Sequence, residues 1–296
     1  MLRNRADIRS LVYMAITTGL LVVNWMRPLE WSVASVALWV WAMFMAVSIS
    51  VMAHNHNHVR MWSNGAMNVL TDWWITCFYG FPVFAWVPTH NMNHHKHTNR
   101  DGDYTITYRL SESNNLVTLL TYPSISGGYQ QFAIRDYIKA LWQRNPKGFW
   151  LAMMQVVVLL TFTIGLLVLD WRRALLFVVL PQQFALFTVL IFNYVQHVHA
   201  DEESRWNHSR NIVGPWMNML LFNNGFHTVH HNNPGMHWSE LPAAHAAIAH
   251  NIDPSLNERS FWWYMTRNYV LGLLFERFRT RSMRLDRMHG SAEAAE

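Results

Sequence analysis

The stretch His90-Asn91-Met92-Asn93-His94-His95-Lys96-His97-Thr98 places four histidines within eight positions, directly after an apolar segment. Three further histidine clusters lie at residues 54–58, 193–199 and 227–231. Together the four clusters contain 12 of the 17 histidines of the chain. Because the neutral imidazole is the commonest metal ligand in proteins, this pattern predicts a metal site to which distant segments contribute.

The composition is that of a membrane protein. Of the 296 residues, 51% are hydrophobic and 14% are charged, whereas an ordinary soluble domain is about 25% charged. The single cysteine, Cys77, excludes an internal disulfide and an iron–sulfur cluster held by four thiolates. The net charge of +5 is spread over the flanks of the apolar runs, which favours membrane lipid as the partner, and we expect no nucleic-acid partner.

Four apolar runs approach the roughly 20 residues that a helix needs to cross a bilayer. They lie at about residues 11–26, 31–53, 149–169 and 174–195. Tryptophans stand at several of their ends, as expected at headgroup depth. Arginines precede the first run and no small-x-small cleavage site follows it, so we predict an uncleaved span.

A fifth apolar segment, residues 66–87, is long enough to span but is interrupted by Asn68, Asp72, Gly80 and Pro82. If it crossed the bilayer, the first two histidine clusters would face opposite sides and could not share a metal site. We therefore expect a segment that enters the membrane and returns to the same side. Such broken backbone is tolerated at membrane depth where protein buries it.

The distribution of basic residues predicts the orientation. With four spans, 20 lysines and arginines fall on the side of the termini and 3 on the other, so the first side is cytoplasmic. All four histidine clusters fall on this side. We therefore predict an all-α integral membrane protein with four transmembrane helices, the returning segment and a cytoplasmic helical cap that holds a two-metal site. We expect one domain over residues 1–296, with a helix at about 255–289 that lies on the membrane surface or packs on the cap.

The spacing within the clusters suits metal binding by helices. Residues four apart share one face of a helix, as do His54 and His58, His90 and His94, and Asn193 and His197. His227, His230 and His231 fall in one narrow stripe. Nine histidines exceed the four ligands of a tetrahedral zinc, so two metals are the natural number.

These spacings resemble the three histidine boxes of membrane fatty-acid desaturases and hydroxylases. The first box matches His54 and His58, and the further boxes match the sets His90, His94, His95 and His227, His230, His231. Asn193-x-x-x-His197 is similar to the family's extra ligand pair, in which the histidine binds iron and the asparagine reaches iron through water. The resemblance covers roughly residues 10–245, with the elements in the same order.

The resemblance implies two Fe2+ ions, with O2 as co-substrate, and no catalytic residue beyond the metal ligands. The implied ligands are His54, His58, His90, His94, His95, His197, His227, His230 and His231, with Asn193 acting through water. His56, His97 and His199 are expected to support ligands without binding metal. On a regular helix His97 would share a face with His90 and His94, whereas the family pattern selects His95, and we follow the family pattern.

The implied activity is O2-dependent oxidation of an unactivated C–H bond in a fatty acyl or related lipid chain, with desaturation expected. Hydroxylation, ketolation and 1-alkene-forming decarboxylation stay open, because all begin with the same hydrogen abstraction. No His-Pro-Gly-Gly motif occurs, so electrons must come from a separate ferredoxin, rubredoxin or cytochrome. We expect location in a bacterial inner membrane with the active site cytoplasmic.

Two other classes of protein compete with this interpretation. A zinc-dependent membrane hydrolase would need about three protein ligands and a water, which would leave most of the histidines unused. A haem or metal-transport protein should carry its ligands within the spans, whereas these lie at the ends of the spans. Metal content separates the three classes.

Overall fold

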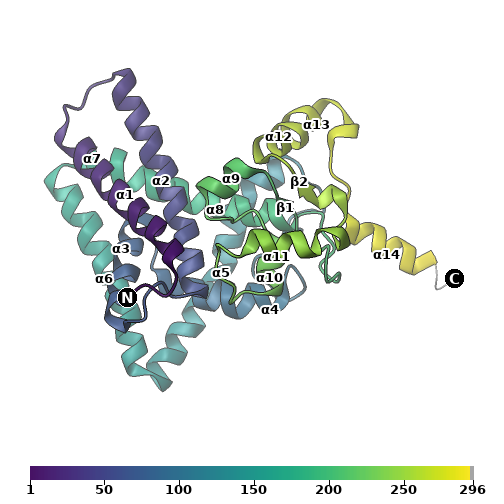
Figure 1. Cartoon of the computed structure of the whole chain (residues 1–296), viewed down its shortest axis with the longest axis horizontal. Coiled ribbons are helices and arrows are strands. Elements are labelled where there is room, and N and C mark those ends of the chain that lie inside the picture. Colours follow the sequence, from purple (N-terminus) through teal and green to yellow (C-terminus); the bar gives the residue numbers. More distant parts are fainter. Residues whose placement is uncertain (294–296) are drawn as a thin grey trace. The chain divides into compact units, whose positions relative to one another are not determined.

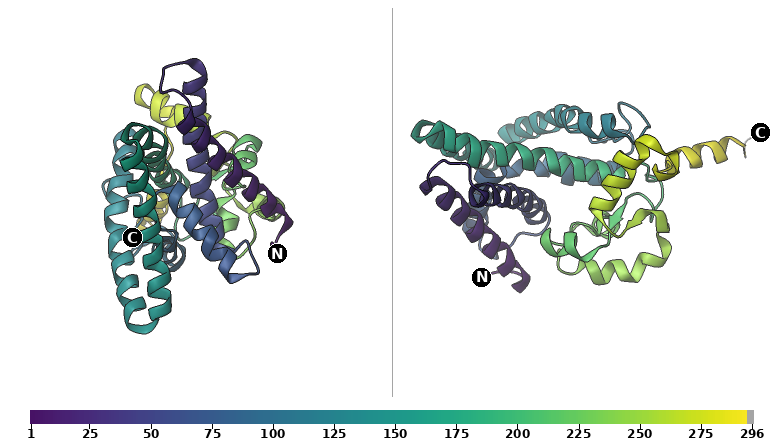
Figure 2. Two further views of the ribbon diagram at one scale, coloured as in Figure 1. Left: turned by 90° about the vertical axis from the view of Figure 1, so that its left-hand side faces the viewer. Right: turned by 90° about the horizontal axis from the view of Figure 1, so that it is seen from above.

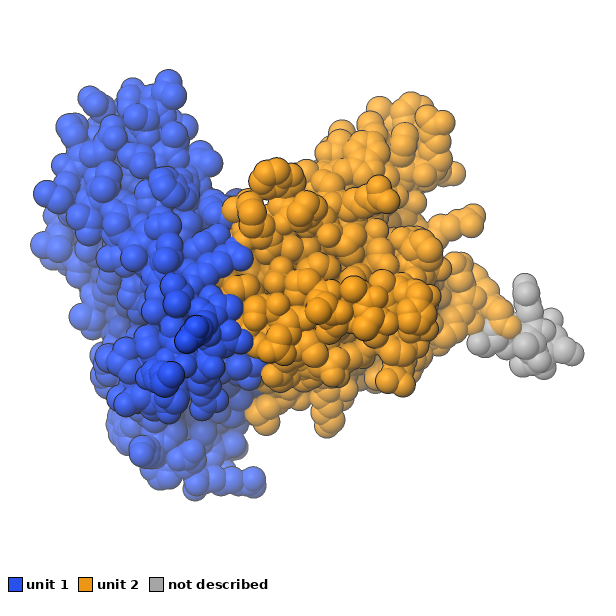
Figure 3. Space-filling model, in the orientation of Figure 1, with its two compact units in different colours: residues 1–89, 134–189 blue, residues 90–133, 190–296 orange. Residues whose placement is uncertain are grey.

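The computed structural model describes residues 1–293, and the chain is predominantly helical (Figure 1). Its contacts divide it into two compact units, coloured separately in Figure 3. Unit 1 comprises residues 1–89 and 134–189, and unit 2 comprises residues 90–133 and those from Leu190 onward. Two units that are each compact can still fold together as one domain, so the single domain stays a prediction.

Within residues 1–293, four helices are long and apolar enough to cross a membrane, as predicted. They are Arg5–Met26, Val33–His58, Pro146–Leu169 and Trp171–His197. The first contains α1 (Ile8–Met26), the second is α2 and the third is α6; the fourth comprises α7 (Trp171–Ala174), η4 (Leu175–Val179) and α8 (Leu180–His197). Each extends past the apolar run in the sequence, because polar residues form its first or last turn.

Side chains at the helix starts show why these helices begin where they do. The Ser32 hydroxyl accepts a hydrogen bond from the Ser35 amide at the start of α2. Asn145 caps α6 in the same way, with Pro146 in the first turn, where proline's missing N–H costs no helical bond. At its other end α2 continues through the first histidine cluster, so His54 and His58 lie in its last turns.

The interrupted segment of unit 1 forms α3 (Gly65–Tyr79) and the short turn η2 (Val83–Ala85). The α3 helix ends at Gly80, which has a φ of 80°, a left-handed conformation that glycine adopts at little cost. The Gln182 side chain lies against Gly80 and its Nε2 donates to the Cys77 carbonyl. Within unit 1, α3 packs against α2 and α6, while α1 runs along α2 (Figure 2).

Unit 2 gathers short elements around the beginning of α5 (Leu116–Arg144) and the end of α8. They are η3 (Val87–His94, from His90 onward), α4 (His95–His97), α9 (Pro215–Leu220), α10 (His227–Asn232), α11 (Leu241–Ile248) and the parallel pair β1 (Asn211–Ile212) and β2 (Asn257–Glu258). One core cluster joins Leu119 and Tyr122 of α5 to Tyr194 of α8 and to Tyr264. This cluster holds the end of α8 beside α5.

The segment expected as one surface helix at about 255–289 is divided into short elements. They are η6 (Pro254–Leu256), β2, α12 (Phe261–Thr266), η7 (Arg267–Leu271), α13 (Gly272–Leu274), η8 (Glu276–Phe278) and α14 (Met283–Glu293). Asn268 and Tyr269 turn inward, where both bond Asn114, and Phe275 adopts an extended conformation that ends α13. Because these buried polar bonds hold the middle of the segment in the core of unit 2, one straight helix does not form.

Candidate metal centre

The second histidine cluster lies on a π-helical stretch, η3, that runs directly into α4. A π-helix bonds residues i and i+5, so each turn holds more residues than in an α-helix. His90 and His95, five apart, consequently come together, with their Nε2 atoms 3.0 Å apart. The His97 ring instead lies over Gly102, where an added Cβ would come within 2.8 Å of it. The regular helix that would favour His97 is therefore not formed here.

Four imidazoles of unit 2 converge at one point. They come from the end of η3, the end of α8 and the α10 helix: His94, His197, His227 and His231. Their ligand atoms all lie within 4.8 Å of one another. The closest approaches of His197 Nε2 are 3.1 Å to His94 Nε2 and 2.9 Å to His227 Nε2. Metal bonds of roughly 2.1 Å at right angles would put neighbouring nitrogens roughly 3 Å apart, so the spacing suits a shared ion.

The other nitrogens of His94 and His197 show that this set fits a cation. His94 Nδ1 lies 2.8 Å from the Asp103 carboxylate, and His197 Nδ1 lies 3.1 Å from the His208 carbonyl oxygen. Both partners only accept hydrogen bonds, so the single proton of each neutral ring lies on Nδ1. The two Nε2 atoms then face each other with lone pairs at 3.1 Å. Two such lone pairs repel, and a cation between them removes the repulsion.

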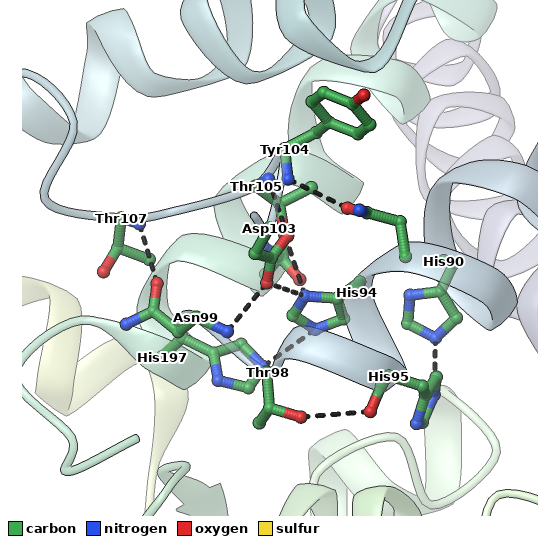
Figure 4. A network of polar contacts seen from close by, with 12 residues as sticks. His90, His94, His95, Thr98, Asn99, Asp103, Tyr104, Thr105, Thr107 and His197 are labelled. Carbon is green, nitrogen blue, oxygen red and sulfur yellow. Dashed lines mark hydrogen bonds and ion pairs between the residues drawn. The ribbon is translucent and has the colours of Figure 1, made fainter. Parts of the chain in front are cut away.

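Asp103 is the centre of a buried network around His94 (Figure 4). Its carboxylate accepts from His94 Nδ1, from the Asn99 amide at 2.7 Å and from the Thr105 hydroxyl at 2.6 Å. Burial alone would raise the pKa of Asp103, but the His94 ring and the Thr105 donors hold that pKa below its usual range. Thr98 and Asn99 have positive φ values of 46° and 64°, which turn the chain so that Asp103 returns to His94. Metal-binding histidines commonly donate their second N–H to such a carboxylate.

A second set of imidazoles in unit 2 comprises His90, His95 and His230. Their ligand atoms also lie within 4.8 Å of one another, and His95 Nε2 is 3.1 Å from His230 Nε2. The first predicted box belongs to unit 1. There His54 and His58 lie on consecutive turns of α2, with ring centroids 4.9 Å apart.

Three other residues expected near the metals, Asn193, His56 and His199, form hydrogen bonds with groups outside the two sets of imidazoles. The Asn193 Nδ2 donates to the Tyr122 hydroxyl at 2.6 Å. The Met61 amide donates to His56 Nδ1 at 3.2 Å, which ties His56 to the connection between α2 and α3. His199 Nε2 donates to the Glu112 carbonyl at 2.8 Å. Of the acidic residues that follow the histidine clusters, Asp103 is in contact with a candidate ligand, whereas Asp201 and Glu202 pair with Arg287, and Glu203 pairs with Arg100.

The comparison with protein families agrees with this arrangement. A family model described as fatty acid desaturase matches residues 29–263, which is more than half of the chain. The chain belongs to the fatty acid desaturase family. The resemblance seen in the histidine spacing is thereby confirmed. No curated protein matched the chain. Members of the fatty acid desaturase family are oxidoreductases that act on lipid or acyl chains. Membership of this family, together with the four long apolar helices within residues 1–293, indicates a membrane protein.

Sequence reasoning missed two residues of this desaturase-family site. His208 is buried, and its ring centroid lies 5.5 Å from that of His231. Burial lowers the pKa of His208 to about 4, so the ring is neutral at physiological pH. The Thr105 hydroxyl oxygen lies 2.8 Å from His94 Nδ1. Neither residue belongs to a histidine box, and their roles depend on a backbone carbonyl and a loop turn that spacing does not reveal.

Proposed function

We propose that this protein is an O2-dependent di-iron oxidoreductase of lipid metabolism that desaturates a fatty acyl or related lipid chain. The observation that supports it most is the convergence of seven imidazoles in unit 2 into two sets with facing Nε2 atoms. Family membership adds the lipid chain and the oxidative chemistry. Bound iron would supply the activation of O2 and the removal of hydrogen from carbon.

We assign the ligands to two ions. One set is His94, His197, His227 and His231, all from unit 2. The other is His90, His95 and His230, to which we propose that His54 and His58 of α2 are added. The chain's own residues keep these ligands in the required state: Asp103 holds the Nδ1 proton of His94, and the His208 carbonyl holds that of His197. Neutral nitrogen ligands leave the charge of the metal largely uncompensated, which suits an ion that must accept electrons and bind O2.

The membrane arrangement is part of the proposal. The charge distribution of 20 basic residues against 3 supports termini and histidines on the cytoplasmic side of a bacterial inner membrane. The break at Gly80 supports a segment that returns to that side. Trp262 and Leu274, exposed by 77% and 75%, support contact of α12 and α13 with the lipid surface. Electrons are supplied by a separate ferredoxin, rubredoxin or cytochrome.

The proposal is tested by expressing the chain in a host that makes only saturated lipids, grown in air. Mass spectrometry of the total lipids and hydrocarbons should reveal a new carbon–carbon double bond that is absent with the His94→Ala variant. A hydroxylated or ketone product would keep the di-iron site but change the reaction, and a terminal alkene shorter by one carbon would indicate decarboxylation. A purified protein that holds one zinc and no iron, even after iron supplementation, would overturn the proposal in favour of a hydrolase.

A further inference from the structure

The buried Tyr122 links Asn193, which is expected to reach a metal ion through water, to the hydrogen-bond network around His94. Asn193 lies one turn before His197 on α8, and its Nδ2 is 2.6 Å from the Tyr122 hydroxyl. The same hydroxyl is 2.8 Å from the carbonyl oxygen of Thr105, whose own side-chain hydroxyl contacts His94 Nδ1. Tyr122 is only 4% exposed, at the beginning of α5. The phenol therefore has fixed protein partners in place of exchanging solvent.

The hydrogen-bond chemistry at this phenol determines which way the Asn193 amide points. A carbonyl oxygen can only accept, so the single Tyr122 proton is used in the bond to Thr105. The phenol oxygen must then accept from Asn193, and only the amide nitrogen can donate. The Asn193 NH2 group thus faces Tyr122, and Oδ1 faces elsewhere.

We propose that Tyr122 is a positioning residue that makes Oδ1 the atom of Asn193 presented to the metal site. The inference rests on the proposed function, because it assumes metal beside His197. Residues four apart share a helical face, so Asn193 lies on the face that carries His197. An amide oxygen can bind a cation or accept a hydrogen bond from a water bound to that cation. An NH2 group can do neither, because it only donates hydrogen bonds. Without the phenol, the amide can rotate by half a turn and present its NH2 group instead.

The test uses the full-length protein in detergent, stripped of metal and titrated with Co2+, whose visible spectrum reports its ligands. We expect two bound equivalents in the unaltered protein. Asn193→Ala and Tyr122→Phe should each weaken one equivalent by about tenfold and shift its absorption band, as removal of supporting groups around metals commonly does. The double variant should lose no more affinity than Asn193→Ala alone, because Tyr122 acts through Asn193.

Tyr194 provides a matched control. It is a second buried phenol, with its ring centroid 4.9 Å from that of Tyr122, and it bonds Thr118 at 2.8 Å. Tyr194→Phe removes a buried hydroxyl from the same core and should leave both Co2+ bands unchanged. A shift of equal size in Tyr194→Phe would mean that the bands report core packing, and the inference would be overturned.

Further outcomes separate this inference from the proposed function. If Asn193→Ala shifts a band and Tyr122→Phe does not, or if the two losses add, Tyr122 does not position Asn193 although the metal site stands. If the unaltered protein binds fewer than two equivalents, the proposed function itself fails. Should Tyr122→Phe not fold, as judged by circular dichroism, 3-fluorotyrosine at position 122 keeps the shape and weakens the oxygen as an acceptor. It should shift the same band by a smaller amount, and an unchanged band would overturn the inference.

Discussion

His94 and Asp103, nine residues apart in sequence, are bonded through Nδ1 and a carboxylate oxygen at 2.8 Å, with both side chains buried. The bond fixes the protonated nitrogen of the ring and leaves Nε2 for metal. It also gives the carboxylate a partner, without which its burial would be costly. The candidate metal centre therefore depends on a residue outside every histidine box.

Asp103→Asn should weaken the binding of one iron by about ten- to a hundredfold, since groups that orient metal-binding histidines commonly contribute that much. The neutral amide would bring an NH2 group toward the donors of His94, Asn99 and Thr105. Iron per chain after dialysis, measured by elemental analysis, checks this. The control is Asp101→Asn, because Asp101 is exposed and bonds only the neighbouring Gly102 amide among the residues described. Equal iron loss in both variants would contradict a specific role for Asp103.

Alanine at His94, His197, His227 or His231 should lower iron content and abolish turnover, because each imidazole supplies one of four converging nitrogens. His97→Ala should retain both irons and measurable activity, because the His97 ring lies over Gly102. Iron analysis and product formation in the same preparation provide the measurement. If His97→Ala loses an iron while His95→Ala keeps both, the assignment of the second box is wrong.

Removing metal should lower the thermal stability of the protein as well as its activity. A metal that binds only the folded state stabilises it, and repulsion between facing lone pairs returns when the metal leaves. Melting in detergent should shift to lower temperature after chelation, and Fe2+ added without oxygen should restore it. Zn2+ should restore the stability but not the turnover, because zinc has no redox chemistry. An unchanged melting temperature would mean that these histidines hold no ion.

Single cysteines should report the membrane orientation once the buried Cys77 is replaced by serine. A cysteine at Ser113 should resist a membrane-impermeant reagent in intact cells, whereas one at Arg172 should react, because the basic residues place position 172 outside. Labelling in opened cells confirms that position 113 is reactive. Labelling of position 113 from outside would mean that the segment at 66–87 crosses the membrane.

Gly80→Ala should destabilise unit 1 by about 1–2 kcal/mol from the left-handed backbone alone. The clash of the new Cβ with Gln182 adds to this cost. Gly165→Ala is the matched control, because open space surrounds that position and it lies inside α6. Thermal unfolding in detergent measures both variants. Equal melting temperatures of the two variants would show that the left-handed backbone at position 80 does not require glycine.

The sequence predicted those parts of the molecule that follow from periodicity and side-chain chemistry. Long uncharged runs gave four candidate spans, since a bilayer allows few alternatives to an apolar helix. The histidine spacing gave the family, because His227, His230 and His231 form a stripe on any helix. The spacing does not distinguish Asp103 from the nearby Asp101 as the acceptor for a histidine ligand, since burial is decided by the turn at Thr98 and Asn99.

Other features could not be predicted because they depend on contacts between distant residues. The π-helical stretch that brings His95 beside His90 follows no local propensity. The division of residues 255–289 depends on Asn114, more than a hundred residues earlier in the chain. The part played by His208 depends on its carbonyl, which every residue type possesses, so side-chain identity gives no indication of it.

The different acceptors of His94 and His197 have a consequence for how the gene tolerates mutation. His197 donates to a main-chain carbonyl, which no substitution at His208 removes, provided that the backbone keeps its course. His94 donates to a side chain, and a single nucleotide change in the Asp103 codon can eliminate that acceptor. In a library of random variants, position 103 should therefore accept very few residues, whereas position 208 should accept several buried ones.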